Sequence, residues 1–299
     1  MNTFSGTYVA LATPFDVDGG LDLASMVKLL QHVAPHVDHL VVLGSTGEAA
    51  TVTEPEREIL IKTCLREAQG RPVWVGTGHN ATAQAIAWTQ HAQRLGAAGA
   101  LVVTPYYNKP TPEGLFLHYQ AIARAVPGFP LIVYNVPGRT GLNITPATMN
   151  RLWQIPEVVA LKESSGNLVQ IAEIARSLPE NKVLLAGDDV HALASIALGA
   201  QGLVSVMANL VPEKTQHLVD SARSGLLPQA LAIHRELAPL MDALFVETNP
   251  IPLKAGLALM GLAQDHVRLP LTVASPATRK LLQSVLATVQ VQTQASTQV

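Results

Sequence analysis

Residues 158–167 read VVALKESSGN, and this short stretch decides the fold. Its four leading apolar residues show no alternation with polar ones, which indicates a strand buried on both faces, as in a parallel sheet covered by helices. A lysine, Lys162, then stands where the strand is expected to end. The stretch therefore predicts one strand of a helix-covered parallel sheet, with a cation at its end.

The same kind of apolar run recurs along the chain. Runs rich in Val, Leu and Ile lie near residues 7–12, 39–43, 73–76, 100–103, 131–134, 158–161, 183–186 and 203–206. Most gaps between them have room for a helix. Eight strand–helix units with no break in composition predict a closed (β/α)8 TIM barrel of the α/β class, in preference to an open doubly wound sheet.

Two segments between these runs carry helix signals. In PEGLFLHYQAIARAV, residues 112–126, one face is apolar at helical spacing: Leu115, Phe116, Tyr119, Ile122, Ala123 and Val126. The segment TEPE, Thr53 to Glu56, matches a capping box with a proline in the first turn. Both patterns predict helices on the outside of the barrel.

The C-terminal part of the chain differs from the rest. Strand signals stop after Pro228, while helix-like segments continue to about residue 285. We therefore expect a barrel with the active site over residues 1–225 and a helical C-terminal appendage over residues 226–299. The final stretch VQVQTQASTQV, residues 289–299, is polar and is expected to fray.

Composition excludes several classes of partner. Twenty basic and 22 acidic residues give a net charge of −2 with no run of either sign, which argues against nucleic acid or an anionic membrane surface and favours a small molecule. Cys64 is the only cysteine, so no disulfide framework exists and a cytoplasmic location is expected. No signal peptide or apolar run long enough for a membrane span is visible. GDD at 187–189 is only a weak metal motif.

Polar residues gather where the predicted strands end. The stretches that follow the strands include LGSTGEA, GTGHN, VTPYYNKP, YNVPGRTG, LKESSGN, AGDD and VSVMAN. Each alone is typical of a turn. Because the chemistry of such barrels lies at the carboxyl ends of the strands, hydroxyls, an arginine and a lysine on one rim predict an active site there.

Lys162 is the most informative of these residues. It can snorkel to solvent, pair with a carboxylate such as that of Glu163, or point into the barrel, and the phase of the strand decides among these. Burial in an apolar barrel lowers the pKa of an amine and frees it as a nucleophile for a carbonyl. A ketone or a 2-oxo acid would be the natural substrate.

Five ordered motifs between about Gly6 and Leu282, GSTGEA, TPYYNKP, YNVPGRT, LKE and FVETNPIP, resemble those of the dihydrodipicolinate synthase family. This family belongs to the class I pyruvate-dependent aldolase and lyase superfamily. The resemblance implies a lyase of lysine and diaminopimelate biosynthesis. In this activity Lys162 forms a Schiff base with pyruvate, and the enamine attacks L-aspartate-4-semialdehyde to give 4-hydroxy-tetrahydrodipicolinate. It implies no metal and no organic cofactor.

The resemblance also implies roles for individual residues. Tyr134 would be the general acid/base beside the imine, linked through Ser45 to Tyr107 in a hydroxyl relay. Phenols suit this role because their hydroxyl groups both donate and accept hydrogen bonds. Thr46 and its loop amides would bind the pyruvate carboxylate, and Arg139 would bind the carboxylate of the aldehyde. Two residues would line the pocket, Gly187 and Val204.

One departure leaves alternatives open. The family commonly has Thr-Thr where this chain has Ser45-Thr46, and GSTGEA is also common in N-acetylneuraminate lyases. Arg139 favours the synthase, because the sugar-acid lyases lack an arginine at the matching place. An N-acetylneuraminate lyase-like enzyme or another 2-oxo acid aldolase is the alternative. A non-catalytic 2-oxo acid binder is a weaker one.

The family also implies assembly and regulation. Its members place Tyr107 in the active site of a neighbouring subunit and commonly form a homotetramer, a dimer of tight dimers. Free lysine inhibits many members at that tight interface, where this chain aligns Ala49, Ala50, Glu54, Arg57, Asn80, Gln84 and Tyr106. Sensitive members use serine, histidines and glutamate in place of Ala49, Glu54, Arg57 and Gln84. Weak or absent inhibition by lysine is therefore expected.

Overall fold

The computed structural model describes residues 3–296 and contains eight parallel strands closed into a barrel. Each strand pairs with the next along the chain, and β8 pairs with β1, so the predicted (β/α)8 fold is confirmed. The strands are β1 (Gly6–Ala10), β2 (His39–Val42), β3 (Val73–Gly76), β4 (Gly99–Val103), β5 (Leu131–Asn135), β6 (Val158–Glu163), β7 (Val183–Ala186) and β8 (Gly202–Ser205).

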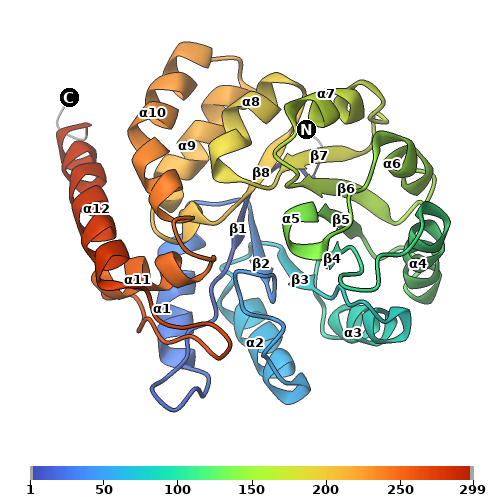
Figure 1. Ribbon diagram of the computed structural model, residues 1–299, viewed down its shortest axis with the longest axis horizontal. Helices are drawn as coiled ribbons and strands as arrows, with labels where there is room; N and C mark the ends of the chain where they lie inside the picture. Colours follow the sequence, from blue (N-terminus) through green and yellow to red (C-terminus); the bar gives the residue numbers. More distant parts are fainter. Residues whose placement is uncertain (1–2, 297–299) are drawn as a thin grey trace.

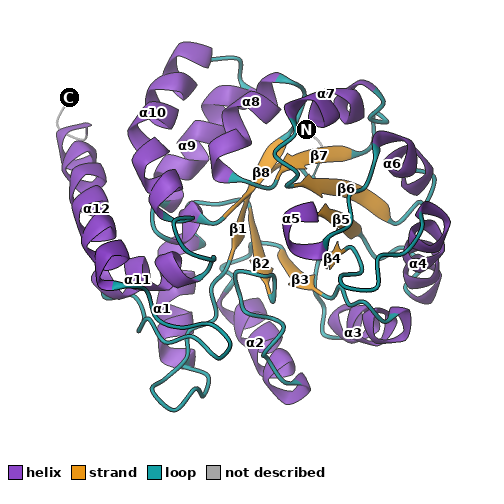
Figure 2. Ribbon diagram, viewed as in Figure 1, coloured by secondary structure: helices purple, strands orange, loops and turns teal. Residues whose placement is uncertain are grey.

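Helices surround the barrel on the outside (Figures 1 and 2). Those between strands are α1 (Leu23–Val33), α2 (Glu54–Glu67), α3 (Thr82–Arg94), α4 (Pro112–Ala125), α5 (Pro137–Thr140), α6 (Pro146–Leu152), α7 (Leu168–Arg176) and α8 (Ala192–Ala197), with 3-10 turns η1 (Asp189–His191) and, after β8, η2 (Met207–Asn209). After η2 come α9 (Pro212–Arg223), α10 (Leu227–Ala243), α11 (Ile251–Leu259) and α12 (Pro276–Ser296). In Figure 1, α5 lies over the barrel opening.

Two apolar layers explain why the strands show no alternation in the sequence. In β5, Ile132 and Tyr134 belong to the cluster that fills the barrel interior, whereas Leu131 and Val133 belong to the larger cluster between barrel and helices. Successive side chains of a strand point to opposite faces, and here both faces are apolar. A continuous apolar run is therefore what a barrel strand requires.

The predicted helix signals are confirmed. Thr53 and Glu56 form the reciprocal capping box at the start of α2, with Pro55 in its first turn. The apolar face of α4 packs inward, with Tyr119 and Ile122 fully buried. These helices begin directly after strand-end loops, so their caps also fix where those loops end.

The C-terminal segment is helical, as expected, but longer. Helix α12 runs to Ser296, past residue 285, and it packs on α10 and α11. Residues 289–296, which were expected to fray, continue α12, so fraying is wrong for them, whereas residues 297–299 lie outside the described part. The division of the chain at residue 225 stays a prediction.

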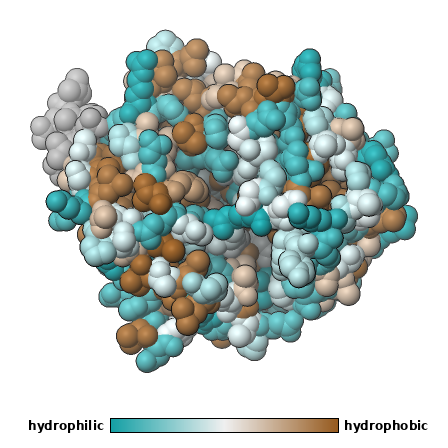
Figure 3. All heavy atoms as spheres, in the orientation of Figure 1, coloured by the Kyte–Doolittle hydropathy of each residue, from teal (hydrophilic) through white to brown (hydrophobic). Residues whose placement is uncertain are grey.

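The surface is of mixed character. Figure 3 shows hydrophilic and hydrophobic residues interspersed over the face that it presents. Within residues 3–296, no helix has both the length and the apolar character needed to span a membrane.

Candidate active site

The phase of β6 turns Lys162 into the barrel. Ala160, two residues earlier on the same face, belongs to the interior cluster, whereas Leu161 belongs to the outer one. Lys162 is buried, with 5% of its surface exposed. Its amine therefore faces the interior at the carboxyl end of β6, where the chemistry of such barrels takes place.

Tyr134 is the immediate neighbour of this amine. The two residues are paired in the register of β5 with β6, and Nζ of Lys162 lies 4.0 Å from the centroid of the Tyr134 ring. Across the described residues, Lys162 forms no ion pair with a carboxylate within 4.0 Å. Of the three possibilities left open by the sequence, snorkelling and pairing with Glu163 are therefore wrong.

Glu163 instead binds groups on the outer side of the barrel. Its carboxylate accepts hydrogen bonds from Asn135 Nδ2 at 2.9 and 3.1 Å, from the Ser165 N–H at 2.7 Å and from Gln170 Nε2 at 3.4 Å. Burial raises the pKa of Glu163, and these hydrogen bonds oppose that rise. Asn135 and Glu163 directly follow Tyr134 and Lys162, so this contact fixes the two strand ends against each other.

Ser45 and Thr46 lie in the loop after β2. The loop begins at Leu43, a buried residue with φ of 61°, a conformation that costs a non-glycine residue free energy. A Cβ on Gly76 would lie 1.8 Å from the Leu43 carbonyl oxygen, so only glycine permits this close approach. The Thr13 hydroxyl also donates to the Gly47 carbonyl at 2.7 Å. The loop is thus held tightly against β3 and the end of β1.

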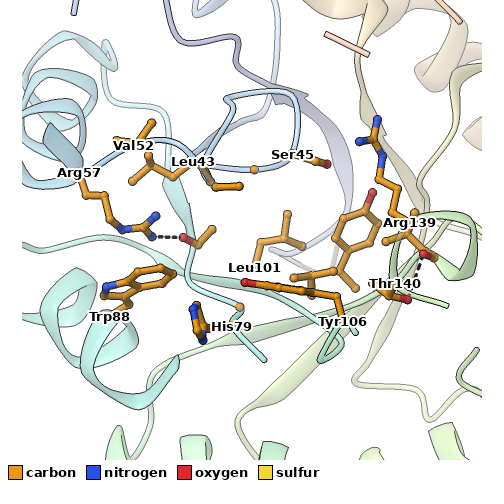
Figure 4. A pocket seen from close by; sticks show the side chains of 18 residues that line it. Leu43, Ser45, Val52, Arg57, His79, Trp88, Leu101, Tyr106, Arg139 and Thr140 are labelled. Atoms are coloured by element: carbon orange, nitrogen blue, oxygen red, sulfur yellow. Dashed lines mark hydrogen bonds between the residues drawn. The ribbon is translucent and has the colours of Figure 1, made fainter. Parts of the chain in front are cut away.

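A cavity of about 430 Å³ opens beside these residues. Ser45, Tyr134 and Arg139 line it, whereas Lys162 and Thr46 are not among its walls. Figure 4 shows Ser45 and Arg139 toward one end of this cavity and Arg57, Trp88 and His79 toward the other. The Tyr134 ring lines the cavity and also contacts the Lys162 amine, so it lies between the two.

Gly187 and Val204 lie at the ends of β7 and β8. Val204 is 1% exposed and packs in the interior cluster with Tyr134. A Cβ on Gly187 would lie 1.8 Å from Ser164 Oγ and 2.9 Å from the backbone carbonyl oxygen of Glu163, so the end of β6 leaves little room for a side chain there. Neither residue lines the cavity as it stands.

Asp189, the last residue of the weak GDD motif, is used within the fold. It accepts hydrogen bonds from Ser205 Oγ at 2.5 Å and from the N–H groups of Val206 and Met207 at 3.0 and 2.9 Å. Within residues 3–296 no cluster of three or more His, Cys, Asp or Glu residues is arranged to hold a metal ion.

Tyr107 lies apart from the other predicted residues. Its side chain is 90% exposed, its φ is 73°, and it does not line the cavity of its own chain, although Tyr106 does. The structure therefore does not bring Tyr107 to Ser45 within one chain.

A residue not singled out from the sequence, Asn249, connects two that were. Its Nδ2 donates to Thr46 Oγ1 at 3.0 Å, and its backbone carbonyl accepts from Arg139 Nη2 at 3.0 Å. Asn249 lies in the motif FVETNPIP, between α10 and α11. The sequence signal that could have pointed to Asn249 is this motif itself, because it lies beyond the predicted barrel, among residues expected to form helices.

A buried ion pair ties the same C-terminal segment to the Ser45 loop. Lys254 of α11 pairs with Glu48, with their side chains only 1% and 2% exposed. Glu48 also accepts from the Arg268 N–H at 3.0 Å. Burial lowers the pKa of Lys254 to about 8, and the Glu48 carboxylate opposes that fall. The predicted appendage is thus connected to the active-site loop.

Fold and site together define a class of protein: a (β/α)8 barrel with a buried lysine amine beside a tyrosine at the carboxyl ends of its strands. The chain belongs to the Dihydrodipicolinate synthetase family, which it matches over residues 3–289.

Individual proteins of known sequence or structure agree. The 4-hydroxy-tetrahydrodipicolinate synthase of Thermosynechococcus vestitus is 46% identical over 288 residues, covering 96% of this chain and 97% of the relative. A crystal structure of the chloride-inhibited dihydrodipicolinate synthase from Acinetobacter baumannii, complexed with pyruvate, is 41% identical. It has a TM-score of 0.93, and the match covers 96% of this chain and 99% of the A. baumannii chain. The crystal structure of the enzyme from Cyanidioschyzon merolae with lysine bound is 38% identical. It has a TM-score of 0.94, and the match covers 97% of this chain and 99% of that chain. These relatives support a synthase and not the N-acetylneuraminate lyase alternative.

Proposed function

We propose that this protein condenses pyruvate with L-aspartate-4-semialdehyde to give 4-hydroxy-tetrahydrodipicolinate, through a Schiff base on Lys162. The observation that carries the proposal is the buried Lys162 amine, 4.0 Å from the Tyr134 ring and without an ion-pair partner in the described chain. The relatives named as 4-hydroxy-tetrahydrodipicolinate synthases support the choice of substrates.

The steps follow from the chemistry of an amine and a 2-oxo acid. The Lys162 amine attacks C2 of pyruvate and water leaves, giving an iminium. Loss of a methyl proton gives the enamine, whose carbon attacks the aldehyde while the new alkoxide takes a proton. The amine of the second substrate then attacks C2 and releases Lys162, which closes the ring, so that one water is lost overall. We assign the proton transfers to Tyr134, whose ring lies beside the Lys162 amine.

The two substrates each carry a carboxylate. We assign the pyruvate carboxylate to Thr46 and its loop, and the aldehyde's carboxylate to Arg139, whose planar fork suits a bidentate contact. We assign Gly187 and Val204 to the wall of the pyruvate subsite beside Lys162, below the cavity that Tyr134 lines. The Ser45 hydroxyl, which lines the cavity with Tyr134, relays protons onward.

Trapping with borohydride tests this proposal. Pyruvate plus borohydride should attach the pyruvate carbons to Lys162 and abolish activity, and Lys162→Met should remove the adduct. Lys62→Met, at an exposed lysine of α2, is the matched control and should keep it. The other buried lysines have partners, Lys254 with Glu48 and Lys182 with three backbone carbonyls. An adduct on one of these, or none, contradicts the mechanism.

We also propose a cytoplasmic homotetramer in which Tyr107 completes the active site of a neighbouring subunit. The exposed Tyr107 side chain supports this, because it lies outside its own cavity. Inactive Lys162→Met and Tyr107→Phe variants, mixed and allowed to exchange subunits, should regain activity through hybrid sites. An active, strictly monomeric species in sedimentation velocity would refute the requirement.

A further inference from the structure

Asn249 lies between the two residues that we assign to the substrate carboxylates. It belongs to the connection between α10 and α11, is 5% exposed, and is separated from Thr46 by 203 positions in the chain. Its side chain contacts Thr46 and its backbone contacts Arg139. One residue outside the barrel therefore touches both subsites.

The contact with Thr46 sets the direction of a proton. A threonine hydroxyl has one proton to donate and lone pairs that accept. Asn249 Nδ2 donates to Thr46 Oγ1 at 3.0 Å, so the oxygen acts as the acceptor in this pair. No hydrogen bond donated by Thr46 Oγ1 is present within residues 3–296. The hydroxyl proton is left for a ligand, and a carboxylate is the acceptor that it would bind most strongly.

The contact with Arg139 anchors a side chain that is otherwise exposed. The guanidinium donates from Nη2 to the Asn249 carbonyl at 3.0 Å. A long side chain loses rotamer freedom when it binds a ligand, and an existing anchor reduces that loss. Because the acceptor is a backbone oxygen, substitution of the Asn249 side chain leaves this contact possible.

The position of Asn249 is itself held by the buried pair of Lys254 and Glu48. Glu48 stands two residues after Thr46, and Lys254 stands five residues after Asn249. Lys254 also donates to the His266 carbonyl at 2.7 Å. The Ser45 loop and the C-terminal segment thus meet at two points, which restricts the distance between Asn249 and Thr46.

We infer that Asn249 is a positioning residue of the pyruvate-carboxylate subsite. Its side-chain amide directs the Thr46 hydroxyl proton toward the ligand, and its backbone carbonyl orients Arg139. This inference rests on the proposed function, because it takes Thr46 and Arg139 as the groups that bind the two carboxylates.

Steady-state kinetics with each substrate varied in turn test the inference. Asn249→Ala should raise the KM for pyruvate by about tenfold while changing the KM for the aldehyde by less than about twofold. Asn249→Asp keeps the size of the side chain but accepts the Thr46 proton and repels a carboxylate. It should raise the KM for pyruvate by about 100-fold. If Asn249 only supported the fold, its substitution would change the KM values for both substrates, or would lower the free energy of unfolding and leave both KM values unchanged.

A double-mutant cycle with Thr46→Val tests the role assigned to Thr46 separately from the role inferred for Asn249. If Thr46→Val leaves the KM for pyruvate unchanged, the assignment of Thr46 in the proposed function is wrong. If Thr46→Val raises it and Asn249→Ala does not, the inference about Asn249 is wrong. We expect the double variant to match Thr46→Val, because the amide acts through that hydroxyl; independent, multiplicative effects would overturn the inference. The pyruvate concentration that half-saturates borohydride trapping gives the same comparison without turnover.

Discussion

Lys162 and Tyr134 are directly opposite one another in the pairing of β6 with β5, with Nζ of Lys162 4.0 Å from the centroid of the Tyr134 ring. Both side chains point into the barrel, and the residues that follow them, Glu163 and Asn135, bind each other on the outer side. An amine and a phenol are thus held together by strand register, so their relative position does not depend on a mobile loop.

The first prediction concerns the Tyr134 hydroxyl. Tyr134→Phe keeps the ring over the Lys162 amine but removes the hydroxyl to which we assign the proton transfers, so kcat should fall by about 100-fold or more. The control is Tyr8→Phe, which removes a buried hydroxyl that donates to the Phe4 carbonyl at 2.8 Å and does not line the cavity. That variant should lose stability and keep kcat. Comparable losses of kcat in both variants would contradict the assigned role.

The second prediction concerns Arg139. Arg139→Ala should lose activity mainly through the aldehyde substrate, with imine formation from pyruvate retained. A lost charged hydrogen bond of roughly 1.5 to 3 kcal/mol corresponds to about a tenfold or larger rise in KM for the aldehyde. Arg124→Ala, at an exposed arginine of α4, should change neither KM. Activity on N-acetylneuraminate equal to that on the aldehyde, or an unaffected Arg139 variant, would instead favour a sugar-acid lyase.

The strands could be predicted from the sequence, but the direction of Lys162 could not. Both faces of a barrel strand are apolar, so Ala160 and Leu161 give no phase, and only closure of the barrel shows which one faces inward. The contact of Asn249 with Thr46 could not be predicted for a different reason. It spans 203 positions, and hydrogen bonds between distant loops leave no periodic pattern in a chain. The end of α12 was also misplaced, because polar residues near a terminus can still continue a helix.

The third prediction concerns stability in acid. The pKa of Glu56 is lowered to about 2, chiefly because Arg268 donates hydrogen bonds to its carboxylate. Arg268 also donates to the Thr51 carbonyl at 2.8 Å, so it ties α2 to the Ser45 loop. A carboxylate with a lowered pKa in the folded state stabilises above its unfolded pKa, and this contribution is lost as pH falls from about 4.5 through about 2.

Thermal denaturation of Glu56→Gln checks this prediction. At pH 7 the variant should be less stable than the unsubstituted protein by roughly 2 kcal/mol, and the difference should shrink as pH falls toward 3. Glu180→Gln, at an exposed glutamate before β7, should follow the unsubstituted protein at every pH. A constant difference between Glu56→Gln and the unsubstituted protein across this range would show that the Arg268 pair does not titrate as proposed.

The last prediction is that free lysine inhibits this enzyme weakly or not at all. Arg57 is 3% exposed, its guanidinium lies 3.9 Å from the Trp88 ring centroid, and its Nη1 has no hydrogen-bond partner within residues 3–296. Burial lowers the pKa of Arg57 only to about 10, so it stays a cation at neutral pH and repels the ammonium groups of lysine. Glu54 lies close enough to Arg57 for its charge to oppose the lowering of the Arg57 pKa, and its Oε1 accepts from Gln84 Nε2 at 3.1 Å and Trp88 Nε1 at 3.3 Å, which holds this carboxylate against α3.

The family resemblance implies that the neutral Gln84 stands where lysine-sensitive members have a glutamate for the α-ammonium group of lysine. A missing charge-assisted hydrogen bond of roughly 1.5 to 3 kcal/mol weakens binding by at least about tenfold. The measurement is a lysine titration of the initial rate at saturating substrates, and half-inhibition well below about 1 mM would refute the prediction. Gln84→Glu should increase sensitivity to lysine, because it restores the carboxylate beside Glu54. Gln93→Glu makes the same chemical change near the other end of α3, away from Glu54, and should leave the response to lysine unchanged.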